Sequence, residues 1–166
     1  MSWLLLLACS GPGAVGTGVD VTPVAIGEAE CAVCGMMVGE QPSPRGQLTY
    51  RDGSRDFVCS IEELRAMAQQ RTAKGHPVGV FVEALPVSFE PETNSSVQQP
   101  WVPASEAWFV FGTTRQGVMG EPVLSFTTEE TAAAFAERVH TTPVDWAALE
   151  SAPFHTIPAG AGVRNP

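Results

Sequence analysis

The sequence predicts an α+β fold made of two related ββαβ units packed together. Each half of the chain has two short apolar runs separated by turn residues, then a capped amphipathic segment, then a further apolar run. The chain has 166 residues, of which 44% are hydrophobic, which is enough for one medium-sized domain or two small ones that share a core. We therefore expect the same order of elements in both halves.

The first two strands of each unit are expected to pair as a hairpin. In the first unit, strand-like runs at residues 46–50 and 55–59 flank an Asp-Gly pair, which favours a tight turn. In the second unit, residues 107–111 are strongly apolar, and a Gly-containing turn region separates them from a second run at residues 122–126. These runs predict the strands of two hairpins.

A helix is expected directly after each hairpin. Ser60 and Glu63 form a capping box at the start of the first helix, and Thr127 and Glu130 form the corresponding box in the second half. A Gly-His-Pro sequence ends the first helix, and the apolar run 78–82 that follows it predicts a buried strand. A Pro-Val pair after the second helix predicts the last strand.

The N-terminus resembles a bacterial lipoprotein signal. A short apolar run ends in Leu-Leu-Ala-Cys at residues 6–9, and small flexible residues follow it. This run is too short to cross a bilayer, which needs about 20 apolar residues. We therefore expect cleavage before Cys9 and acylation of Cys9, which would anchor an exported protein to the membrane through lipid.

The predicted organisation has six segments. They are a lipoprotein signal at residues 1–9, a flexible tether at 10–27, a first ββαβ unit at 28–90, a Pro/Ser/Asn-rich linker at 91–100, a second ββαβ unit at 101–152 and a C-terminal tail at 153–166.

The charge balance argues against nucleic acid as a partner. The chain has 18 acidic and 9 basic residues, for a formal net charge of −9, and the basic residues do not form a patch that could neutralise phosphates. The glycine patterns of hydrolase elbows, phosphate-binding loops and dinucleotide-binding folds are also missing from the sequence. Hydrolase and nucleotide chemistry therefore have no basis in the sequence.

The stretch from Cys31 to Met37 packs two thiols and two thioethers into one short segment. Such soft donors together favour Cu(I), whereas zinc sites usually recruit imidazole or further thiolates. Either methionine could instead fill space in the core. A third thiol, Cys59, ends an apolar run just ahead of a helix, where a small buried residue is expected.

Two other uses of the Cys31–Cys34 pair compete with copper. A thiol-disulfide oxidoreductase would use the pair as a redox couple, but residues 39–46 contain two prolines and two glycines and cannot supply the helix that stabilises its thiolate. A structural zinc site would need a second ligand pair, which the sequence does not show beside this one. We expect structural or surface roles for the histidines, which are His76, His140 and His155. The alternative is that one of them completes the copper shell, and His155 in the C-terminal tail could reach furthest.

Several motifs between residues 28 and 145 carry a family resemblance. They are CxxCGM at residues 31–36, the Asp-Gly turn leading to Phe57, Ser60 at a helix start, the aromatic block at residues 101–111, and Met119-Gly120 ahead of Ser125-Phe126 and an Ala-rich helix. In combination they resemble the NosL family, whose members are lipid-anchored copper chaperones for the assembly of nitrous-oxide reductase.

The resemblance implies a fold, a cargo and a partner. The fold would be the two-unit arrangement of the NosL and organomercurial lyase families, and the site would hold Cu(I) through Cys34, Met36 and Met119. Cys31 would be a second thiolate, a resolving thiol or a structural residue. The partner would be a copper-accepting apo-enzyme, nitrous-oxide reductase by resemblance, reached from a lipid-anchored position facing the periplasm.

Overall fold

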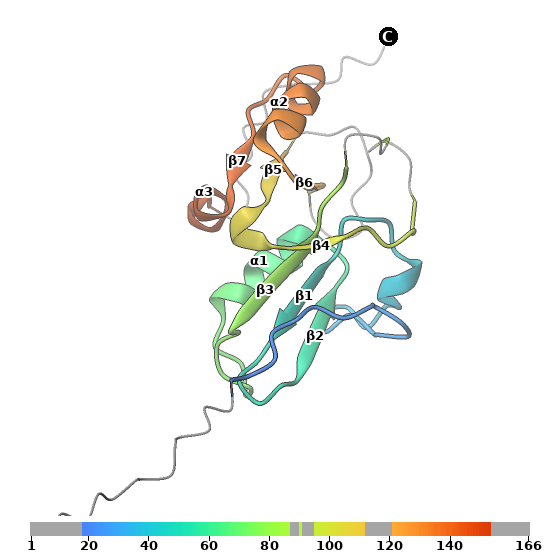
Figure 1. The fold of residues 1–166 in the computed structure, drawn as a ribbon, viewed down its shortest axis with the longest axis vertical. Helices are drawn as coiled ribbons and strands as arrows, with labels where there is room; N and C mark the ends of the chain where they lie inside the picture. Colours follow the sequence, from blue (N-terminus) through green and yellow to red (C-terminus); the bar gives the residue numbers. More distant parts are fainter. Residues whose placement is uncertain (1–17, 87–89, 91–94, 112–120, 154–166) are drawn as a thin grey trace, which may run out of the picture.

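The protein is described here by a computed structural model, which covers residues 18–86, 90, 95–111 and 121–153. This part of the chain contains two antiparallel sheets and three α-helices, with two short 3-10 turns, Val38–Glu40 and Ala104–Glu106 (Figure 1). The predicted α+β class is therefore confirmed. Among the helices of the covered residues, none has the length and apolar character that a membrane crossing requires.

The first sheet has the strand order β2-β1-β3-β4. Its strands are β1 (Gly46–Thr49), β2 (Arg55–Val58), β3 (Gly79–Glu83) and β4 (Trp101–Pro103). Helix α1 (Ile61–Gln69) lies against β1 so closely that a Cβ on Gly46 would come within 2.7 Å of the Leu64 side chain. A glycine in the central strand thus lets the helix that follows β2 pack on the sheet.

The second sheet has the order β6-β5-β7. It is made of β5 (Trp108–Val110), β6 (Leu124–Phe126) and β7 (Val144–Asp145), with α2 (Glu129–Arg138) between β6 and β7 in sequence and α3 (Trp146–Ser151) after β7. In both sheets the first strand of the unit lies between the second and the third.

Three details of the second half differ from the expectations. The run Trp101–Pro103, expected at the start of the second unit, is the edge strand β4 of the first sheet, where it pairs with β3. The cap of α2 is Thr128 and not Thr127, because Thr128 Oγ1 accepts the hydrogen bond of the Thr131 N–H at 3.2 Å. Helix α3 was not expected, and it begins where Asp145 accepts the N–H of Ala148.

The two halves are joined by buried contacts. Leu85 follows β3 and pairs with Phe126 of β6, and Ser125 Oγ donates to the carbonyl of Glu83 at 2.6 Å. From α1, Arg65 reaches across and donates to the carbonyls of Leu149 and Ala152 at the end of α3, both at 2.9 Å. The CxxC motif lies in the first half, where it pairs with β2 close to the connection between β2 and α1.

A buried ion pair fixes the segment that follows the CxxC motif. The side chain of Arg45 is 1% exposed and that of Glu83 is fully buried, and their charged ends meet at 2.7 Å. Arg45 Nη1 also donates to the carbonyls of Val38, Gly39 and Gln41. The guanidinium therefore holds residues 38–41 against the first sheet.

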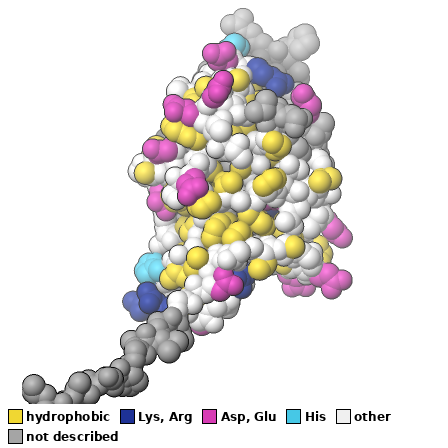
Figure 2. Space-filling view, viewed as in Figure 1, with side chains coloured by type: hydrophobic (Ala, Val, Ile, Leu, Met, Phe, Trp, Pro, Cys, Tyr) yellow, Lys and Arg dark blue, Asp and Glu magenta, His cyan; other side chains and the backbone are white. Residues whose placement is uncertain are grey.

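The surface in Figure 2 carries scattered acidic side chains, with few and separated lysines and arginines. A basic stripe of the kind that follows a phosphate backbone is not visible on this face.

Candidate metal site

The CxxC motif forms a tight loop beside the end of β2. The Cys31 N–H donates to the Met36 carbonyl at 2.8 Å, and the Gly35 N–H donates to the Cys31 carbonyl at 2.9 Å. Gly35 has a φ of 74°, a conformation that glycine adopts without strain. The Ala32 N–H donates to the carbonyl of Phe57, so the loop is tied directly to β2.

Cys59 and Glu63 lie where β2 passes into α1. Ser60 caps the helix as predicted, since its Oγ accepts the Glu63 N–H at 3.2 Å. The Glu63 carboxylate does not return to the Ser60 N–H as in a complete capping box. Its Oε2 instead accepts the Cys59 N–H at 2.9 Å, which turns the carboxylate toward the CxxC loop.

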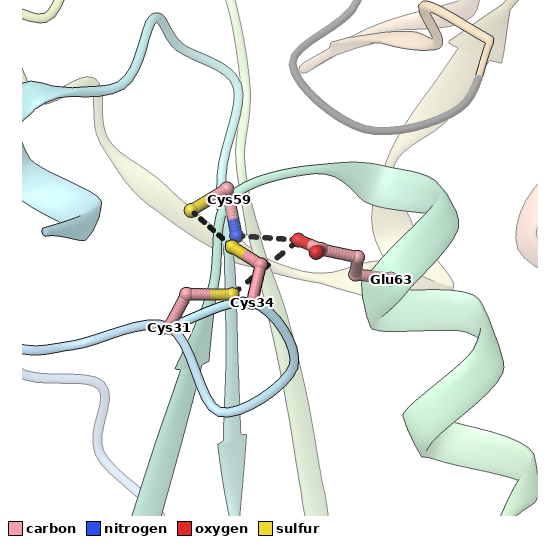
Figure 3. A group of neighbouring side chains, drawn as sticks. All are labelled: Cys31, Cys34, Cys59 and Glu63. Carbon is pink, nitrogen blue, oxygen red and sulfur yellow. Dashed lines mark hydrogen bonds between the residues drawn. The ribbon is translucent and has the colours of Figure 1, made fainter. Parts of the chain in front are cut away.

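Four side chains converge at this point (Figure 3). Their ligand atoms, one each from Cys31, Cys34, Cys59 and Glu63, all lie within 4.8 Å of one another. The sulfur atoms of Cys34 and Cys59 are 3.8 Å apart, and the Cys31 thiol donates to Glu63 Oε2 at 3.5 Å. All three cysteines are free thiols. We call these four residues the thiol cluster.

Burial favours the protonated form of two of the cysteines. It raises the pKa of Cys34, an effect that the hydrogen bond from the Met36 backbone N–H opposes, and it also raises the pKa of Cys59. Cys34 and Cys59 are therefore neutral thiols at pH 7 in the apo site, and an incoming metal ion must displace their protons. Cys34 is the half-buried member of the cluster, whereas Cys31 and Cys59 are buried, so a ligand from outside reaches Cys34 first.

The structure brings together some of the predicted site residues. Cys31 and Cys34 lie in the thiol cluster, while Met36 is half-buried and packs against the hydrophobic core that contains Leu48, Val58 and Leu64. Met119, expected as a ligand, and Cys9, expected as the acylation site, lie outside the described residues. His155 lies outside them as well, and His76 and His140 are exposed.

Sequence reasoning missed two members of the cluster. Cys59 is buried, as expected, but it faces two other thiols and is not an isolated core residue. The capping box predicts only a helix-capping role for Glu63. One sequence feature could have indicated both residues. Cys59 ends a predicted strand, and Glu63 follows four residues later at the third position of the helix, where its side chain points back toward the strand end.

The fold and the site define a small α+β domain with a thiol-rich centre that could hold a metal ion. The NosL family model matches residues 23–151. A curated relative, the copper-binding lipoprotein NosL of Stutzerimonas stutzeri, is 30% identical over 120 residues, or 70% of this chain and 60% of the relative's length. The chain thus spans less than two thirds of that relative. The chain belongs to the NosL family.

Two solved structures are also similar. The crystal structure of the copper chaperone NosL from Shewanella denitrificans matches with a TM-score of 0.61 and 27% identity, over 75% of this chain and 92% of that one. The solution structure of apo-NosL from Achromobacter cycloclastes matches with a TM-score of 0.45 and 20% identity, over 61% of this chain and 82% of that one.

Family membership also decides between the two predicted functional classes, a metallochaperone and a thiol-disulfide oxidoreductase. The family is one of copper chaperones and not of enzymes, as predicted, so the oxidoreductase alternative is set aside. The local structure agrees, because the CxxC loop is followed by the short 3-10 turn Val38–Glu40 and not by a helix that could stabilise a thiolate.

Proposed function

We propose that the protein is a metallochaperone that binds Cu(I) outside the cytoplasm and delivers it for the assembly of a copper enzyme, nitrous-oxide reductase. One observation carries the proposal: three reduced thiols converge within 4.8 Å, and one of them, Cys34, is accessible from outside. Soft thiolates favour Cu(I), and an accessible ligand allows exchange. The name of the curated relative, a copper-binding lipoprotein, supports the same cargo.

Delivery would proceed by ligand exchange at Cys34. A cysteine, methionine or histidine of the acceptor enters the copper shell at the half-buried thiol, while a sulfur of the chaperone leaves. The buried thiols cannot be reached first, because Cys31 and Cys59 are 4% and 1% exposed. The buried thiols thus retain the copper ion, and exchange with the acceptor takes place at Cys34.

The proposed ligands are Cys34, Met36, Met119 and Cys31, and the thiol cluster offers Cys59 as a further sulfur donor. Cys34 is the anchor, and Cys31 lies beside it in the same loop. Met36 follows Cys34 through Gly35, whose positive φ provides the bend that the two side chains need to converge. Met119 would approach from the second half of the chain.

The ligand proposal is tested by titrating the reduced protein with Cu(I) in the presence of a competing chelator. We expect Cys34→Ser to lose Cu(I) retention almost completely, because it removes the central thiolate ligand and the position at which ligands exchange. Met119→Leu, which preserves size and apolar character, is expected to weaken retention by about tenfold or more. Unchanged Cu(I) binding in both variants would remove the proposed site.

The proposed lipid anchor at Cys9 is tested separately in cells. We expect the full-length protein to sediment with membranes, and Cys9→Ala to lose this association because it removes the acylation site. Fractionation with detection of the protein in membrane and soluble periplasmic fractions measures the effect. Equal membrane association of the variant and the native chain would contradict lipid anchoring at Cys9.

A further inference from the structure

We propose that the end of the domain at which the described chain begins is a membrane-facing surface that contacts anionic phospholipid headgroups. The inference rests on the proposed lipid anchor at Cys9, and it adds the face that the folded domain turns toward the bilayer. Three segments form this end of the first sheet, and we call them together the basic end. They are residues 18–22, the turn at residues 51–54 and the connection from α1 to β3 at residues 70–78 (Figure 1).

The three segments of the basic end are held together by side-chain contacts. Arg55, the first residue of β2, donates from Nη2 to two backbone carbonyls of the segment 18–22, at 3.3 and 3.0 Å. Lys74 pairs with Asp56 of β2, and its Nζ lies 5.2 Å from the centre of the Tyr50 ring. Residues that are far apart in sequence therefore share one surface.

The charge of the basic end differs from that of the rest of the protein. Lys and Arg side chains are visible at this end, in the lower part of Figure 2. The basic end contains four basic residues, Arg51, Arg55, Arg71 and Lys74, and three acidic residues, Asp20, Asp52 and Asp56. The whole chain has 9 basic and 18 acidic residues, which leaves five basic and 15 acidic residues for the rest. An anionic bilayer therefore attracts the basic end and repels the remainder.

The side chains of the basic end can reach phosphate groups. Asp20 and Asp52 each accept the backbone N–H of the residue two positions later at 2.9 Å, and Asp56 pairs with the lysine of the same end. Local hydrogen bonds thus hold these carboxylates in place. Arg51 and Arg71 are exposed, and a guanidinium binds phosphate oxygens through two parallel hydrogen bonds.

Exposed valines at the same end are an independent observation that points to a bilayer. Val21 and Val78 are 39% and 40% exposed. Both lie at the start of β3, because Val78 precedes Gly79 and a Cβ on Gly79 would come within 3.4 Å of the Val21 Cβ. Protein segments that lie in the headgroup region combine basic and apolar side chains in this way.

The position of the basic end in the chain agrees with this role. Gly18 follows Cys9 by nine residues, so acylated Cys9 keeps Gly18 within about 30 Å of its lipid. The turn 51–54 lies at one end of the hairpin of β1 and β2, and Cys59 follows the other end of β2. Contact through the basic end thus keeps the thiol cluster away from the bilayer and open to an acceptor.

The test uses Lys74, which is the only lysine in the chain. Full-length, acylated protein is reconstituted into vesicles of phosphatidylcholine alone or of equal parts phosphatidylcholine and phosphatidylglycerol. A water-soluble amine reagent is added, and the labelled peptides are quantified by mass spectrometry. As a matched control, Arg138→Lys places a second amine in the last turn of α2, at the opposite end of the molecule (Figure 1).

We expect labelling of Lys74 to be slower by about fivefold or more on the anionic vesicles than on the neutral ones, because headgroup contact covers the amine. Labelling of the amine introduced by Arg138→Lys should be equal on both. High salt should restore the rate at Lys74, since it screens the surface charge. The double variant Arg51→Gln, Arg71→Gln should lose most of the protection while it retains Cu(I) as the native chain does, which shows that it is folded.

Equal labelling of Lys74 on both kinds of vesicle overturns the inference, as does equal slowing of both amines or full protection of Lys74 in the double variant. Flotation of the vesicles separates this result from a failure of the proposed anchor. Protein that does not float with either kind of vesicle refutes acylation at Cys9, and the inference that rests on it is refuted with it. Protein that floats while Lys74 is labelled equally refutes only the membrane-facing role of the basic end.

Discussion

Glu83→Gln is expected to lower the free energy of unfolding by about 3–5 kcal/mol, the cost of leaving one partner of a buried ion pair without its counter-charge. The carboxylate accepts from Arg45 Nε and Nη2 at 2.7 Å each, and from the backbone N–H groups of Arg45 and Gln99 at 2.9 Å each. Glutamine cannot accept at both positions. The Arg45 guanidinium would then remain buried with an incomplete set of partners. Denaturant unfolding followed by circular dichroism measures the loss.

The matched control is Asp56→Asn, which removes the carboxylate of a salt bridge with Lys74, whose side chain is 36% exposed. Because solvent screens this pair, we expect it to cost less than about 1 kcal/mol. A similar loss of stability in both variants would contradict the role assigned to burial at Glu83.

The parts of the fold that local sequence determines could be predicted. The hairpin of β1 and β2 follows from an Asp-Gly turn between two apolar runs, and Gly53 has the positive φ that such a turn requires. The start of α1 follows from Ser60, whose side chain binds the N–H three residues later. Turns and caps are made by residues close in sequence, so their chemistry can be read directly.

The parts of the fold and of the site that depend on contacts between residues distant in sequence could not be predicted. Strand β4 is separated from β3 by a long connection, and its place in the first sheet depends on pairing with β3. Cys59 is 25 residues from Cys34, and its sulfur meets that of Cys34 only because β2 ties down the CxxC loop. Glu63 enters the site because its carboxylate bonds to Cys59 and not to the cap residue, a choice that the capping pattern does not determine.

Oxidation of the thiol cluster is expected to abolish Cu(I) binding. A diazene oxidant such as diamide takes two hydrogens from two thiols and joins their sulfurs as a disulfide, while the oxidant becomes a hydrazine. Any such pair among Cys31, Cys34 and Cys59 leaves a single free thiol of the three. A sulfur in a disulfide bond binds metal ions far more weakly than a thiolate does, so oxidation removes two of the donors.

The measurement is Cu(I) titration against a competing chelator after the oxidant has been removed, with the number of free thiols counted in the same sample. We expect the oxidised protein to lose Cu(I) retention and a phosphine reductant to restore it fully. Protein loaded with Cu(I) before oxidation should keep its thiols, because metal-bound thiolates react more slowly. If the oxidised protein binds Cu(I) as tightly as the reduced one, copper does not depend on the cysteines, and thioethers outside the thiol cluster must hold it.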